Sequence, residues 1–113
     1  MIKRSAFVLS GETSWETVGA GVRRQVLGHG PDLMMVRVEF ERGAVGTLHH
    51  HPHRQVTYVA AGAFEATVAG ETRRFQPGDC FYVAAELDHG VVAVEPGTLI
   101  DVFTPAREDF LQS

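Results

Sequence analysis

The chain has 113 residues, a formal net charge of −4 and a single cysteine, Cys80. Hydrophobic residues make up 44% and charged residues 21%, a balance that indicates one folded domain and argues against intrinsic disorder. The acidic charge argues against general nucleic-acid binding, because a phosphate backbone is bound by a basic face.

The cysteine count and the apolar segments favour one cellular compartment. A small secreted domain usually carries paired cysteines, so a lone cysteine favours the reducing cytoplasm. The apolar stretch at residues 6–9 is too short for the core of a signal peptide. Nowhere does the chain approach the roughly 18 apolar residues of a membrane span. We therefore expect a cytoplasmic protein with no membrane partner.

Short apolar runs between glycine and proline turns predict strands rather than helices. Residues 33–40 alternate, which places on one face Met34, Val36, Val38 and Phe40. Turns roughly 8 to 12 residues apart are typical of an all-β sandwich or barrel. Pro105 ends the last strand, so residues 106–113 should form a short C-terminal helix or tail. The further expected strands are 55–61, 64–68, 72–75, 80–84, 90–94 and 98–103.

Four histidines lie within residues 48–55, LHHHPHRQ. Side chains on a strand alternate between its faces, so His49 and His51 should point one way and His50 the other. Two imidazoles on the same face can share one metal ion. Pro52 has no N–H for the ladder, so His53 should lie in a bend, and the roles of His50 and His53 stay open.

Two other residues could complete such a site. Gln55 begins the strand after the bend and can return to the same centre. His89 follows a glycine turn and a strand, which should place it at the start of an antiparallel neighbour. The remaining histidine, His29, lies in the sequence GHGPD, a turn that we expect at the surface.

The spacing of these residues resembles the first motif of the cupin family. That motif is a glycine, five residues, His-x-His, three or four residues, a glutamate, six residues and a glycine. Here it runs from Gly43 through His49 and His51 to Gly62, and Gln55 stands in the glutamate position.

A second cupin motif follows, ending at residue 89. Gly78 and His89 match its ends, whereas Ala84 and Glu86 replace its proline and glycine. The resemblance implies one cupin domain over residues 1–113, a double-stranded β-helix or jelly-roll barrel, and a homodimer. It also implies a metal ion inside the barrel, with the ligands His49, His51, Gln55 and His89.

The glutamine affects the charge of that implied site. An amide oxygen leaves the full charge of a divalent ion in place, which favours anionic substrates and Lewis-acid chemistry. A ligand set made mostly of imidazoles suits Zn, Ni, Fe, Mn or Co.

The expected strand 98–103 carries polar residues that suggest a reaction. Asp101 and Phe103 share one face of this strand, and Arg107 follows Pro105. From the strand alone, two interpretations stay open: a structural aspartate with a solvated arginine, or an acid–base group with an anion-binding residue.

Residues 22–109 also resemble the KdgF group of cupins from pectin degradation, through the segments HHHPHRQ and DVFTPARED. That resemblance implies an enzyme acting on a small anionic sugar acid. The reaction converts 4,5-unsaturated uronate monosaccharides to the linear 5-keto-4-deoxyuronate. In this interpretation Asp101 moves a proton, Arg107 binds the substrate carboxylate, and Phe103 forms a wall against the sugar ring.

Two other functions compete with this one. A cupin dioxygenase of the quercetinase type could use the same histidines with iron and O₂. A small-ligand-binding cupin would use the cavity without catalysis. A jelly roll that holds no metal is the simplest alternative of all.

Overall fold

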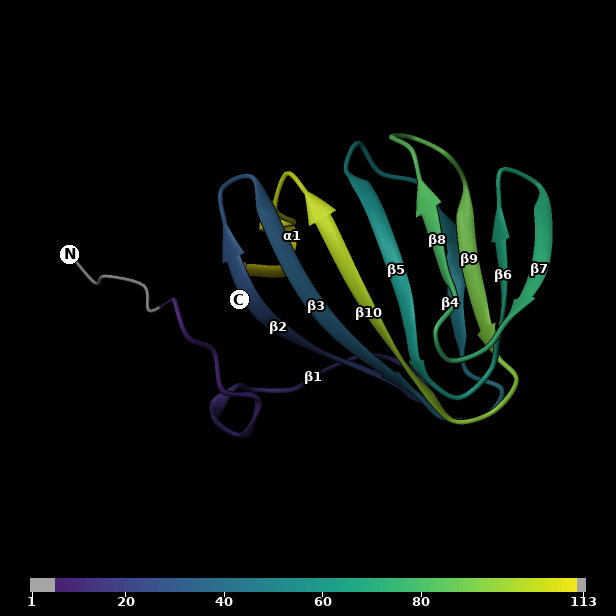
Figure 1. The fold of residues 1–113 in the computed structure, drawn as a ribbon, viewed down its shortest axis with the longest axis horizontal. Helices are drawn as coiled ribbons and strands as arrows, with labels where there is room; N and C mark the ends of the chain where they lie inside the picture. The colour runs from purple at the N-terminus through teal and green to yellow at the C-terminus, as the bar shows by residue number, and fades with distance from the viewer. Residues whose placement is uncertain (1–5, 112–113) are drawn as a thin grey trace.

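In the computed structural model, which describes residues 6–111, ten strands form two antiparallel sheets (Figure 1). The expected all-β architecture is confirmed. The six-stranded sheet has the order β1 (Glu16–Gly19), β2 (Val22–Gly30), β3 (Leu33–Phe40), β10 (Gly97–Thr104), β5 (Arg54–Ala61) and β8 (Cys80–Val83). The four-stranded sheet has the order β4 (Val45–His49), β9 (His89–Ala93), β6 (Phe64–Val68) and β7 (Glu71–Phe75).

Alternating side chains explain how the two sheets close on each other. The even-numbered residues of β3 point inward as expected, and Met34 and Val36 are fully buried. One apolar cluster lies between the sheets, because it joins Val59 and Leu99 of the larger sheet to Phe64 of the smaller one. The core is therefore built from the inward positions of both sheets.

A second apolar cluster lies between the larger sheet and the C-terminal segment. Pro105 ends β10 as expected, and helix α1 (Glu108–Leu111) follows. Phe110 packs edge-on against Phe103 with ring centroids 5.6 Å apart, beside buried Met34 and Ala106. This packing holds α1 against the face of β2, β3 and β10 (Figure 1).

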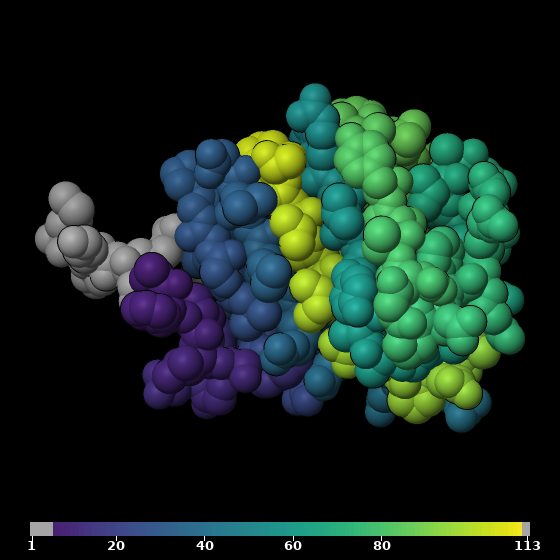
Figure 2. All heavy atoms as spheres, viewed as in Figure 1, coloured from purple at the N-terminus to yellow at the C-terminus, as the bar shows by residue number. Residues whose placement is uncertain are grey.

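The N-terminal segment covers part of β2. The short 3₁₀ helix η1 (Ser10–Glu12) lies at one edge of the molecule, drawn in purple in Figure 2. The buried amide of Gln25 donates to the carbonyl oxygens of Ser10 and Thr13, at 2.7 and 2.9 Å. Within residues 6–111, no helix is long and apolar enough to cross a membrane.

Some boundaries differ from the sequence expectation. His29 lies within β2 rather than in a turn, because β2 and β3 stay paired as far as Gly30 and Leu33. β9 begins at His89, one residue earlier than expected. Residues 1–5 and 112–113, which belong to the domain expected over 1–113 and to its C-terminal tail, lie outside the described residues.

Candidate functional site

Three imidazoles meet where the ends of β4 and β9 lie side by side. The register of these strands pairs His49 directly with His89, so His89 does begin the antiparallel neighbour of the histidine segment. The His49 ring centroid lies 4.3 Å from that of His89 and 5.4 Å from that of His51. One ring nitrogen from each of the three lies within 4.8 Å of the others. Such a group could hold a metal ion.

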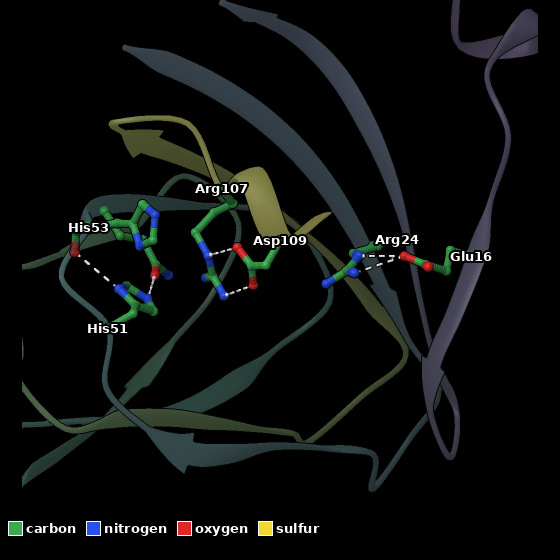
Figure 3. Close-up of polar contacts among 7 residues, drawn as sticks. Glu16, Arg24, His51, His53, Arg107 and Asp109 are labelled. Atoms are coloured by element: carbon green, nitrogen blue, oxygen red, sulfur yellow. Dashed lines mark hydrogen bonds and ion pairs between the residues drawn. The ribbon is translucent and has the colours of Figure 1, made fainter. Parts of the chain in front are cut away.

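His51 reaches this centre by a different route from the one expected. β4 ends at His49, so strand alternation does not direct the His51 side chain. The loop does so instead, because the Glu86 N–H donates to the His51 carbonyl oxygen at 2.8 Å. The His51 ring is then held by the His53 carbonyl oxygen, 3.0 Å from its Nδ1 (Figure 3).

Each ring is oriented by a backbone carbonyl oxygen. His49 Nδ1 lies 2.7 Å from the Thr47 oxygen, and His89 Nδ1 lies 2.9 Å from the Leu87 oxygen. A carbonyl oxygen only accepts, so each Nδ1 must donate and each neutral ring keeps its Nε2 lone pair for the centre. The Nε2 of His89 is buried and has no hydrogen-bond partner among the described residues.

The two buried rings favour their neutral form. Burial penalises the charged ring and lowers the pKa of His51, and the nearby Arg107 guanidinium lowers it further. The pKa of His89 is also lowered, again chiefly by burial. Metal ions bind the neutral imidazole, so both shifts suit a ligand.

Gln55 lies beside these rings with its oxygen toward them. Its Nε2 donates to Thr57 Oγ1 at 2.8 Å and weakly to Asp101 Oδ1 at 3.4 Å, which fixes the orientation of the amide. Its Oε1 lies 3.0 Å from His51 Nε2. When His51 is neutral, two lone pairs therefore face each other, and a cation at that place would relieve their repulsion. Two ligands about 2.1 Å from one ion, at right angles, would be about 3.0 Å apart, so the spacing fits.

Asp101 continues this chain of polar contacts on β10. The hydroxyl of fully buried Thr57 donates to Asp101 Oδ1 at 2.6 Å. Burial raises the pKa of Asp101 to about 6, although the Thr57 hydrogen bond and the Arg107 charge act in the opposite direction. A carboxyl group with this pKa exchanges protons readily near neutral pH.

Arg107 lies close to Asp101 but already has a carboxylate partner. Its Nε and Nη2 donate to the two oxygens of Asp109 at 3.0 and 2.8 Å (Figure 3). The Arg107 side chain is 12% exposed, whereas that of Asp109 is 57% exposed. This pairing lowers the pKa of Asp109. The edge of the guanidinium that carries Nη1 is the one that remains for a ligand.

A cavity of about 280 Å³ connects these groups. Its lining includes most of the residues that the sequence singled out, namely His49, Gln55, His89, Asp101, Phe103 and Arg107. Small-molecule sites are concave, largely apolar and furnished with a few polar groups, and this cavity has that character. Its volume suits a ligand of monosaccharide size.

The other two histidines of the cluster have different surroundings. His50 is exposed, and its Nδ1 lies 3.2 Å from Asp88 Oδ1. His53 accepts the His51 hydrogen bond through its backbone, and its ring stands edge-on to Phe103 with centroids 6.4 Å apart. Neither side chain belongs to the lining of the cavity.

Two polar residues that line the cavity, Thr57 and Arg24, were not predicted from the sequence. Thr57 shares the inward parity of Gln55 on β5, which the period of two would have revealed. Arg24 stands between Val22 and Val26 in the sequence VRRQV, so it interrupts an apolar inward face. A charged residue at such a position is a signal that sequence reading could have used.

Comparisons with known proteins agree with this geometry. Residues 36–103 match the Cupin domain family. The chain is 46% identical over 107 residues to the pectin degradation protein KdgF of Dickeya dadantii, an alignment that covers 93% of this chain and 97% of that protein.

Solved structures show the same relationship. The structure of KdgF from Halomonas sp. has a TM-score of 0.90 and 46% identity, and the match covers 95% of this chain and 99% of that one. An RmlC-like cupin from Shewanella frigidimarina has a TM-score of 0.92 and 43% identity, and covers 97% and 99%. The chain therefore has the jelly-roll fold expected from its sequence and belongs to the cupin family, in the group of the pectin degradation protein KdgF.

Proposed function

We propose that this protein is a metal-dependent enzyme that converts 4,5-unsaturated uronate monosaccharides to the linear 5-keto-4-deoxyuronate. The observation that carries the proposal is a row of polar groups: Gln55 donates to Thr57, Thr57 donates to Asp101, and the Gln55 oxygen faces His51 Nε2 at 3.0 Å. This row joins a carboxyl group with a pKa of about 6 to the group of three imidazoles, two of which, His49 and His89, line the same cavity as Asp101. The relationship of this chain to a pectin degradation protein supports a sugar acid as the substrate.

The reaction rearranges atoms without gain or loss. The anomeric hydroxyl gives up a proton, C1 becomes a carbonyl carbon, and the bond between C1 and the ring oxygen breaks. The electrons of that bond pass to the ring oxygen, which becomes the oxygen of an enolate at C5, and a proton added at C4 turns this enolate into the C5 ketone. Asp101 suits both transfers, because a group with a pKa of about 6 can accept one proton and return another.

The other residues would bind and orient the sugar. The open edge of Arg107 would hold the uronate carboxylate through charge-assisted hydrogen bonds. Phe103, in the lining of the cavity, would limit how the ring can lie. The residues proposed to hold a divalent ion are His49, His51, Gln55 and His89. When bound, the ion would supply positive charge beside the oxygen that becomes anionic as the ring opens.

The direct test is loss of the enol-ether absorbance when the protein is added to unsaturated galacturonate, measured against the rate of spontaneous ring opening. We expect faster loss, formation of the keto acid by NMR, and abolition of both by a chelator, with recovery on adding back Zn, Ni, Fe, Mn or Co one at a time. Absence of any acceleration by metal-loaded protein would overturn the proposal. Oxygen uptake by the iron form, without ring opening, would favour a dioxygenase.

We also propose that two copies associate through the outer face of the six-stranded sheet. In support, the strand register places in one row Met35, Val102, Val56 and Tyr82, and three of these, Met35, Val56 and Tyr82, are exposed. An exposed apolar row of this kind is often an interface. Light scattering should give a dimer mass for the wild type and a monomer mass for Val56→Lys. A monomeric wild type at micromolar concentration would contradict the proposal.

A further inference from the structure

We infer that Arg24 is a second substrate-binding arginine, which selects sugar acids over neutral sugars by contributing to the binding of the substrate carboxylate. The inference deepens the proposed function and rests on the same cavity. It concerns an inward-facing residue of β2, in the sheet opposite the strands that carry His49 and His89, that the motifs of the sequence do not include.

The position of Arg24 is unusual for a charged side chain. Val22 and Val26, its neighbours on the inward face of β2, belong to or pack against the two apolar clusters. Its partner across the ladder on β3 is Val38, another inward apolar residue. A charge at such a place is costly unless it is paired or has a use. Only 19% of the side chain is exposed.

The ion pair with Glu16 engages only part of the guanidinium. Nε and Nη2 lie 2.9 and 2.8 Å from the same oxygen, Glu16 Oε1. Glu16 belongs to the edge strand β1 and is 56% exposed, so it anchors Arg24 from the solvent side. No residue among 6–111 forms a hydrogen bond with Nη1 of Arg24 or of Arg107. Both arginines therefore keep a donor group for a ligand.

A single aromatic ring brings the two arginines together. The Arg24 guanidinium lies 3.6 Å from the centroid of the Phe110 ring, and the Arg107 guanidinium lies 4.2 Å from the same centroid. The two cations are thus at most about 8 Å apart, although they come from opposite ends of the chain. In the view of Figure 3 the Arg24 guanidinium lies between Glu16, with which it pairs, and the Arg107–Asp109 pair.

The charges around the cavity favour an anion. Its charged lining residues are Arg24, Arg107 and Asp101. Glu16 and Asp109, the carboxylates that pair with the arginines, are more than half exposed and do not belong to the lining. Water screens these exposed carboxylates more than the two largely buried guanidinium groups, so the donors that line the cavity favour a carboxylate over a neutral sugar.

The inference is tested by calorimetry, which measures the affinity of the protein for galacturonate, a saturated sugar acid that cannot react. The affinity for galactose, its neutral counterpart, is measured for comparison. Charge-assisted hydrogen bonds support an expected loss of about tenfold in galacturonate affinity for Arg24→Gln. Arg23→Gln is the matched control, because Arg23 directly precedes Arg24, is paired to Glu39 in the same way, and has a side chain that is 51% exposed outside the cavity. We expect it to bind like the wild type. Equal affinity of Arg24→Gln and wild type would overturn the inference.

Further variants separate substrate binding from a structural role in seating α1. Arg24→Lys keeps the charge and should recover part of the affinity. Glu16→Gln removes the anchor but leaves the cation, so it should bind galacturonate at least as well as the wild type. If Glu16→Gln lost as much affinity as Arg24→Gln, the role of Arg24 would be structural and the inference wrong.

Steady-state turnover of unsaturated galacturonate distinguishes this inference from the proposed reaction. We expect Arg24→Gln to raise KM about tenfold and to change kcat less than twofold. If the wild type turns over the substrate and Arg24→Gln has the same KM as the wild type, the inference is wrong and the proposed reaction is unaffected. If the wild type binds galacturonate through Arg24 but does not turn over the unsaturated sugar, the proposed reaction is wrong and the inference on Arg24 is unaffected.

Discussion

Replacing Asp101 with asparagine should stabilise the metal-free protein at pH 8 while greatly slowing its catalysis. Asparagine has the shape of aspartate, and its oxygen can still accept from the Thr57 hydroxyl and the Gln55 amide. What the change removes is a negative charge that lies partly buried in the lining of the cavity. Ionised Asp101 therefore lowers the free energy of unfolding, as expected of a residue that is retained for chemistry rather than for folding.

The magnitude follows from the pKa of Asp101, which burial raises from 3.8 to about 6. About two units at 1.36 kcal/mol each correspond to roughly 3 kcal/mol at pH 8, where the carboxyl group is ionised in both states. The folded state holds its proton more tightly than the unfolded state, so this contribution to stability is full below pH 3.8 and is lost as the pH rises through 6. At pH 5 the advantage of the variant should be about half of its value at pH 8.

The assay is urea unfolding of chelator-treated wild type and Asp101→Asn at pH 8 and pH 5, because a bound ion would itself stabilise the carboxylate. Turnover of unsaturated galacturonate, measured with metal present, should fall about 10²- to 10⁴-fold, the usual contribution of a general acid–base group. An equal or lower stability of the variant at pH 8 would refute the reasoning on burial. An advantage that is the same at both pH values would show that it does not arise from ionisation.

Three further predictions concern the same polar chain. Thr57→Val should lower the free energy of unfolding by about 1–3 kcal/mol, since it leaves a Gln55 donor without its acceptor, whereas Thr57→Ser should lose less; equal losses in urea unfolding would contradict this. Gln55→Glu should tighten metal binding by titration and lower kcat, because a second carboxylate offsets the charge of the ion and faces Asp101; an unchanged kcat would argue against a role for that charge. In metal-free Asp101→Asn, the free energy of unfolding should fall as the pH drops below 6.5. The folded state lowers the pKa of His51 and His89, so the unfolded state takes up protons at a higher pH than the folded state does. A free energy of unfolding that is constant from pH 7 to 5 would contradict those shifts.

Much of the strand pattern and the candidate site could be predicted because its determinants are local. The period of two along β5 places Gln55 inward and Tyr58 outward, and the structure has them so. The same alternation on β10 places Asp101 in the cavity with Phe103. Motif spacing likewise singled out the histidines that meet, because it reflects the lengths of two strands and the loop between them.

What only the tertiary structure decided depends on contacts between segments that are distant in the sequence. A hydrogen bond from the loop before β9, rather than strand alternation, turns His51 into the centre. The meeting of Arg107 with Arg24 on the Phe110 ring requires the C-terminal helix to fold back over β2. The raised pKa of Asp101 arises from burial by several strands. Strand alternation and turn chemistry act over a few residues and can be read from the sequence. Burial and interactions between charges act through space, so they are set only when the barrel closes.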